Sequence, residues 1–130
     1  MLDFGFGLPA SLRKYIIGVV KGADLEELYA WSDLILIPSL WEGLPLAMLE
    51  AVSKGVVPIV SDVGGMGDFV REHGVGAVVD WHNVSEVLKL ITSMIEDPKI
   101  INQYQKSCIE YSSRHSWNDS SKEFLDEVLN

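Results

Sequence analysis

The stretch that decides the fold reads Ser39-Leu40-Trp41-Glu42-Gly43-Leu44-Pro45-Leu46-Ala47-Met48-Leu49-Glu50-Ala51. It follows a short apolar run, Leu34–Pro38, and leads through a helically spaced segment to a second run, Val56–Val60. Strand, helix and strand in this order predict two parallel strands joined by a crossover helix. The loop from 39 to 45 then lies at the carboxyl end of the first strand, which is the edge where open α/β sheets bind ligands.

The same alternation extends in both directions along the chain. Continuous apolar runs bounded by Gly, Asp, Ser and Pro predict strands that are buried on both faces, as in a parallel sheet. The four predicted strands are Tyr15–Val20, Leu34–Pro38, Val56–Val60 and Gly76–Val79. The helices predicted between them are Asp24–Trp31, Pro45–Lys54 and Gly67–Glu72.

After Asp80 the pattern becomes helical. Ser85–Glu96 and Lys99–Tyr111 are predicted helices, and a third follows Trp117. We expect one α/β domain over residues 1–130, a Rossmann-like parallel sheet with flanking helices, in which residues 1–14 form a poorly determined lead-in.

The composition of the chain disfavours several classes of binding partner. A net charge of −9 disfavours nucleic acids and anionic membranes, since both attract basic surfaces. Cys108 is the only cysteine, so an intrachain disulfide and a cysteine-based metal site are excluded, and a reducing cytoplasm fits. No apolar run approaches the ~20 residues of a spanning helix, and we expect no signal peptide.

The loop and the helix after it favour a phosphate ligand. Pro45 suits the first helical position, and no side chain before it offers an oxygen to cap the helix. The N–H groups of Leu46, Ala47 and Met48, together with the helix dipole, then attract a phosphate. Gly43 allows a ligand close to the backbone.

Three further features leave alternatives open. Glu42 and Glu50 could grip two sets of hydroxyls on one ligand, or Glu42 could only favour the helix dipole while Glu50 is an ordinary helix residue. Gly64-Gly65 is either a second phosphate-binding turn or a tight strand-to-helix connection. Trp41 is either a sugar-stacking residue or a packing residue.

Ser39 to Ala51, followed by Gly55 to Gly65, resembles the E-x7-E region of retaining glycosyltransferases of family GT4. The segments Gly18–Val20 and Leu28–Leu34 are similar to that family's run-in, and His115-Ser116-Trp117 resembles its closing helix. The resemblance implies the C-terminal, donor-binding half of the two-domain GT-B fold.

The resemblance also implies a role for each matching residue. Glu42, the catalytic candidate, would face the donor sugar's hydroxyls, and Glu50 would accept hydrogen bonds from the ribose. The backbone at Gly43, Leu44 and Leu46 would contact the sugar and diphosphate. The base would lie near Val19 and Val20. No metal or cofactor is implied, because the nucleotide-diphosphate sugar is a substrate.

The implied function is the transfer of a sugar from a nucleotide sugar to a glycan, lipid or other acceptor in the cytoplasm. The family's diphosphate-binding Arg and Lys, its first strands and its acceptor-binding N-terminal domain would all precede this chain, so we expect the fragment to be inactive. The alternative is a non-catalytic α/β module that binds nucleotide sugars or proteins.

The missing strands have a structural consequence for this chain. We expect a rearranged sheet of four strands, with Tyr15–Val20 directly beside Leu34–Pro38, and possible homodimerisation. Leu25, Leu28, Tyr29, Ile35 and Ile37 would line the exposed region.

Overall fold

The computed structural model describes residues 11, 15 and 17–115. They divide into two compact units, one ending at Trp31 and one beginning at Ser32. The predicted helix after Trp117 lies outside the described residues. Each unit is described by itself below.

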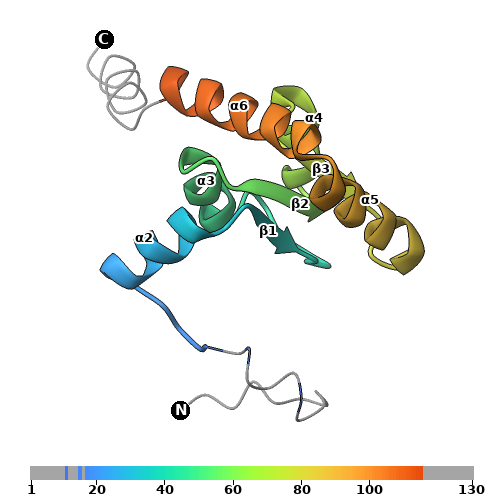
Figure 1. The fold of residues 1–130 in the computed structure, drawn as a ribbon, viewed down its shortest axis with the longest axis horizontal. Coiled ribbons are helices and arrows are strands. Elements are labelled where there is room, and N and C mark those ends of the chain that lie inside the picture. Colours follow the sequence, from blue (N-terminus) through green and yellow to red (C-terminus); the bar gives the residue numbers. More distant parts are fainter. Residues whose placement is uncertain (1–10, 12–14, 16, 116–130) are drawn as a thin grey trace. The chain divides into compact units, whose positions relative to one another are not determined.

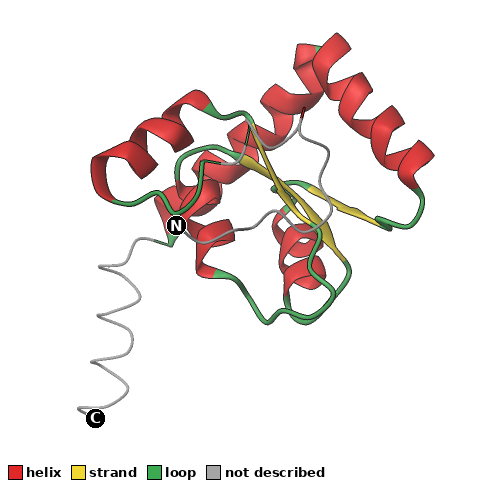
Figure 2. Ribbon diagram, turned by 90° about the horizontal axis from the view of Figure 1, so that it is seen from below, coloured by secondary structure: helices red, strands yellow, loops and turns green. Residues whose placement is uncertain are grey.

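The second unit carries the sheet. Three parallel strands, in the order β1-β2-β3, are β1 (Leu34–Ile37), β2 (Val57–Ser61) and β3 (Ala77–Val79). Leu34 pairs with Val57 in the first ladder, and Ile59 pairs with Ala77 in the second. Figure 2 shows the three strands side by side among the flanking helices. Three of the four predicted strands are therefore confirmed.

The helices of this unit agree with the sequence prediction to within a few residues. Two of them connect the strands, α3 (Leu46–Ser53) between β1 and β2 and α4 (Met66–His73) between β2 and β3. Two more follow the sheet, α5 (Val84–Glu96) and α6 (Pro98–Arg114) (Figure 1). Asn83 and Asp97 cap these last two helices through side-chain oxygens.

The core lies on the central strand. Every residue of β2 is buried, as continuous apolarity predicts for a parallel strand. Around it pack Met48 and Val52 from α3 and Met66, Phe69 and Val70 from α4, with Cys108 from α6. β1 and β3 are only partly buried, because each is an edge strand of the described sheet.

The predicted strand Tyr15–Val20 is wrong. Tyr15 forms a turn, residues 17–20 have no regular structure, and Gly18 adopts a left-handed φ of 77° that breaks an extended run. Ile17 and Val19 are each 66% exposed, so this apolar run is not a buried strand. The expected four-strand sheet is therefore wrong as well, since β1 pairs with β2 alone among the described strands.

The unit ending at Trp31 contains α2 (Gly22–Trp31), which confirms the predicted helix and begins two residues earlier. Tyr29 is buried, contrary to the expected exposure, whereas Leu25 and Leu28 are half-buried. In the sheet, Ile35 and Ile37 are also half-buried, and Leu36 between them is exposed. Burial along this edge strand is therefore not a strict alternation, because Leu34, on the same face as Leu36, is half-buried.

Candidate functional site

The loop between β1 and α3 spans residues 38–45 and leaves the carboxyl end of a parallel strand. Glu42 is half-buried within it, whereas Gly43 and Leu44 are exposed. Leu40 and Trp41 are almost fully exposed, at 86% and 92%. The structure therefore places Glu42 where a ligand of the sheet would lie, with apolar side chains open to solvent beside it.

The turn after β2 rests directly on this loop. Gly64 has a left-handed φ of 54°, and a Cβ built on it would stand 1.8 Å from the carbonyl oxygen of Glu42. The same Cβ would lie 3.2 Å from the carbonyl oxygen of Gly43. Only glycine meets both demands, so the Gly64-Gly65 turn fixes the backbone on which Glu42 stands.

The start of α3 agrees with the prediction in one respect and corrects it in two. No side chain caps the helix, as expected. Pro45 is the N-cap residue, with extended backbone, and not the first helical residue. Its carbonyl accepts the N–H of Met48 at 3.0 Å, so that N–H is already engaged. The phosphate-binding donors are therefore fewer than the three predicted, because the chain tightens its own first turn.

Glu50 lies inside α3, at its fifth position, and is half-buried. Its carbonyl oxygen accepts a hydrogen bond of 2.6 Å from the Ser53 hydroxyl. Leu46, which begins the helix, is 54% exposed. Glu42, Gly43, Leu44, Leu46 and Glu50 thus all belong to one loop and the helix that it enters.

An ion pair that the sequence did not predict stands at the end of β2. The Arg71 guanidinium donates to both carboxylate oxygens of Asp62, with Nη1 2.9 Å from Oδ1, and also lies 3.4 Å from Asp68. These bonds lower the pKa of Asp62 and raise that of Arg71. A Cβ on Gly67 would meet the Asp62 carboxylate at 2.3 Å, so glycine there leaves the space that the pair occupies. The sequence feature that could have predicted this ion pair is an aspartate at the end of a strand followed by an arginine on the next helix.

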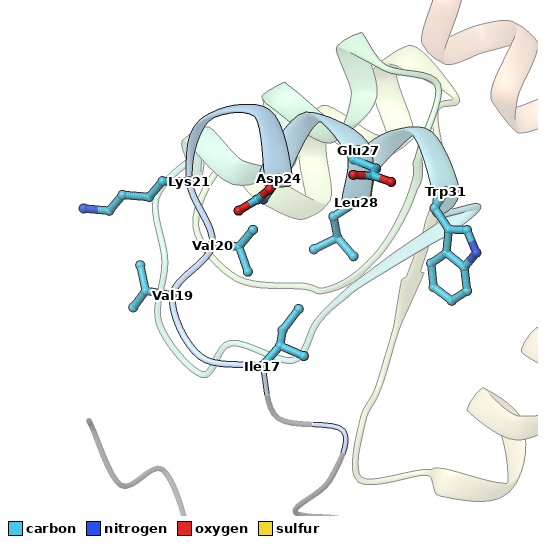
Figure 3. A pocket seen from close by; sticks show the side chains of 8 residues that line it. All are labelled: Ile17, Val19, Val20, Lys21, Asp24, Glu27, Leu28 and Trp31. Atoms are coloured by element: carbon cyan, nitrogen blue, oxygen red, sulfur yellow. The ribbon is translucent and has the colours of Figure 1, made fainter.

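The remaining predicted residues, Val19 and Val20, belong to the unit that ends at Trp31. They line a pocket of about 450 Å³ beside α2. Figure 3 shows the side chains of Ile17, Val20 and Leu28 gathered in its middle, whereas Lys21 and Trp31 lie at its ends. Asp24 and Glu27 add two carboxylates. The pocket therefore combines an apolar centre with hydrogen-bond acceptors.

The part of the chain that the structure describes lacks both a membrane-spanning helix and a cluster of metal ligands. Its helices include none with the length and apolarity needed to cross a bilayer. Its His, Cys, Asp and Glu side chains form no group of three or more that could hold a metal ion.

The known proteins that this chain resembles are glycosyltransferases. The family described as glycosyl transferases group 1 matches residues 13–115. A UDP-Gal:alpha-D-GlcNAc-diphosphoundecaprenol alpha-1,3-galactosyltransferase of Escherichia coli is 29% identical over 107 residues, which cover 82% of this chain and 27% of that protein. A glycogen synthase of Bacillus cytotoxicus is 34% identical over 110 residues, which cover 78% of this chain and 23% of that protein.

A solved structure supports the fold. WaaG, a glycosyltransferase involved in lipopolysaccharide biosynthesis, superposes with a TM-score of 0.70 at 19% identity, over 91% of this chain and 32% of that one. The described sheet and its helices thus match part of a larger protein. The chain spans about a quarter of the length of the two curated relatives.

Proposed function

The chain belongs to the glycosyl transferases group 1 family, and from that premise we propose that it is the donor-binding part of a retaining glycosyltransferase. The whole protein would take a sugar from a nucleotide-diphosphate sugar and transfer it to a glycan, lipid or other acceptor. The observation that carries this proposal is the loop of residues 38–45, held by Gly64 at the carboxyl end of β1 and continuing into α3.

The donor's sugar would lie against Glu42. A carboxylate accepts hydrogen bonds only, and sugar hydroxyls donate them, so Glu42 would orient the sugar. Gly43 and Leu44 would offer backbone groups, and Leu46 would begin a helix whose dipole favours the diphosphate. As the bond between the sugar and the diphosphate breaks, negative charge grows on the diphosphate. The positive end of the helix dipole would stabilise that charge.

The nucleoside would be held by two groups. Glu50 would accept hydrogen bonds from the two ribose hydroxyls, and these bonds are charge-assisted. Taken by itself, the unit that ends at Trp31 offers the base the pocket beside α2, near Val19 and Val20. An apolar centre suits a flat ring, and the carboxylates of Asp24 and Glu27 would accept from its amino or imino groups.

The acceptor and the cell compartment complete the proposal. The acceptor would bind an N-terminal domain outside this chain, and the protein would act in the cytoplasm. A metal ion and a cofactor have no role in it. Of the two named relatives, one name specifies a lipid-linked acceptor and the other a polysaccharide product, which supports a glycan or lipid acceptor.

A binding measurement tests the proposal. The purified chain is titrated with UDP-, GDP- and ADP-sugars in a calorimeter, beside Glu50→Gln and a matched control, Glu96→Gln, at an exposed position of α5. Losing the charge on a carboxylate that holds two hydroxyls should weaken binding about ten-fold or more, since such hydrogen bonds contribute about 1.5–3 kcal/mol. Equal affinity in the two variants would refute the role of Glu50.

A further inference from the structure

A second pocket, of about 550 Å³, lies at the carboxyl ends of all three strands. We name it the strand-end pocket. Its walls come from the segments that follow β1, β2 and β3, and from Arg71 of α4. Ser39 and Leu40 belong both to this pocket and to the loop that carries Glu42. The pocket therefore adjoins the proposed donor site within the same unit.

Charge decides which ligands this pocket excludes. Its titratable lining residues are the carboxylates of Asp62 and Asp80, the guanidinium of Arg71 and the imidazole of His82. Arg71 is already engaged by Asp62 and also by a third carboxylate, that of Asp68. A phosphate or diphosphate placed here would meet a surplus of negative charge. The donor's diphosphate is thus disfavoured, and an uncharged ligand is favoured.

Hydrogen-bonding groups decide which uncharged ligands fit. Asp62 accepts and Arg71 donates, side by side. The Ser39 hydroxyl can do both, and the Ser61 hydroxyl, whose proton goes to the Ile37 carbonyl, can accept. Sugar hydroxyls both donate and accept, so neighbouring hydroxyls on one ring can satisfy an aspartate and an arginine together. The apolar lining, including Val63 and Val78, suits the C–H faces of the same ring.

The wall of the pocket is held in place before any ligand binds. Gly67 leaves room for the Asp62 carboxylate, and the twofold contact with Arg71 fixes the plane of both groups. The Ser61 hydroxyl donates to the Ile37 carbonyl at 3.4 Å, which ties β2 to β1 beneath the pocket. Trp81 is different, because its buried indole N–H finds no acceptor among the described residues.

We propose that the strand-end pocket binds one neutral sugar ring of the acceptor, beside the donor that Glu42 would hold, while the N-terminal domain outside this chain would bind the rest of the acceptor. This inference rests on the proposed function, because only a protein that transfers a sugar needs a site for an acceptor ring. Its test uses sugars without nucleotide, so it can fail or succeed separately from donor binding.

The experiment is a proton–nitrogen NMR titration of the 130-residue chain with the methyl glycosides of glucose, galactose and N-acetylglucosamine. We expect saturable shifts with at least one of them, in the millimolar range, at Asp62, Arg71 and the Trp81 indole. Arg71→Met should weaken that binding about ten-fold. Lys89→Met, which removes an exposed cation from α5, should leave it unchanged.

Three results would overturn the inference. They are no saturable shift with any of the three glycosides, shifts confined to other residues, and equal affinity in the Arg71 and Lys89 variants. If Arg71→Met does not fold, Ser39→Phe decides instead, because it fills the pocket and leaves the Asp62–Arg71 pair intact. Binding that survives this substitution contradicts the inference, and its loss supports it. Glu50→Gln should leave the glycoside titration unchanged.

Discussion

Replacing Gly64 by alanine should break the junction that positions Glu42. The new Cβ would lie 1.8 Å from the Glu42 carbonyl oxygen, so the loop has to move by more than about 1 Å to reach ordinary contact distance. Alanine at a left-handed φ costs about 1–2 kcal/mol, and overpacking against backbone adds about 1–3 kcal/mol. We therefore expect Gly64→Ala to lower the free energy of unfolding by about 2–5 kcal/mol.

The chain supplies two matched controls. Gly74 also has a left-handed φ, of 61°, but a Cβ there meets nothing within 4 Å. Gly74→Ala should therefore show the backbone cost alone, about 1–2 kcal/mol. Gly65 has an ordinary φ of −81° and open space, so Gly65→Ala should be nearly neutral. The difference between the first two variants isolates the contact with Glu42.

Urea unfolding followed by circular dichroism measures the three stabilities, and the backbone amide signals of Glu42 and Gly43 report the loop. Gly64→Ala should shift both signals, whereas Gly74→Ala should not. A misplacement of about 1 Å can lower a reaction rate by about 100-fold. Since Glu42 would orient the donor sugar, we expect donor affinity to fall as well. The reasoning is refuted if Gly64→Ala and Gly74→Ala lose equal stability and the Glu42 signal stays in place.

Four other predictions follow from the same structure. Burial raises the pKa of the Cys108 thiol from 9.0 to about 11, so iodoacetamide should label the folded chain far more slowly than the unfolded chain at pH 8; equal rates would contradict the burial. The folded chain therefore holds the Cys108 proton more tightly than the unfolded chain does. The resulting contribution to the free energy of unfolding is fully present below pH 9 and is lost as the pH rises towards 11. The lowered pKa of Asp62 has the opposite sign: its stabilisation is present above pH 3.8 and is lost as the pH falls through the lower folded value, and acid titration of Arg71→Met should lack this component. The 130 residues alone should transfer no sugar, because Arg71, the cation at the carboxyl edge, is engaged by Asp62 and Asp68; measurable transfer by the purified chain would contradict this. Light scattering should detect dimers, since β1 is an edge strand with Leu36 48% exposed, and a monodisperse monomer would refute the association.

Apolar runs predicted the sheet where the sequence contains the whole strand–helix–strand unit. β1, α3, β2, α4 and β3 follow one another without interruption, and each apolar run meets a neighbouring run that can pair with it. Tyr15–Val20 shows the limit of this reasoning. Its residues have strand propensity, but a strand also needs a hydrogen-bonded partner, and Gly18 adopts a left-handed backbone in its middle.

The sequence predicts which residues belong to the candidate site, but it does not predict the contacts that these residues make. The spacing of Glu42 and Glu50 and the missing helix cap were visible in the sequence. The bond from the Met48 N–H to Pro45 was not visible, because it depends on how tightly the first turn closes. Gly64 was recognised as a turn residue, but its approach to Glu42 joins segments 22 positions apart and requires three-dimensional packing. Asp62 and Arg71 lie only nine positions apart, at a strand end and on the next helix, but their pairing likewise depends on how that helix packs.

We propose above all that the loop after β1 and the start of α3 bind a nucleotide-diphosphate sugar. The most direct test maps the amide shifts of the 130-residue chain as UDP-, GDP- and ADP-sugars are added. We expect one of them to shift the signals from Glu42 to Ala51, together with that of Gly64, and Glu50→Gln to suppress these shifts. Saturable shifts elsewhere with these signals unmoved, or no binding by any of the three donors, would contradict the proposal.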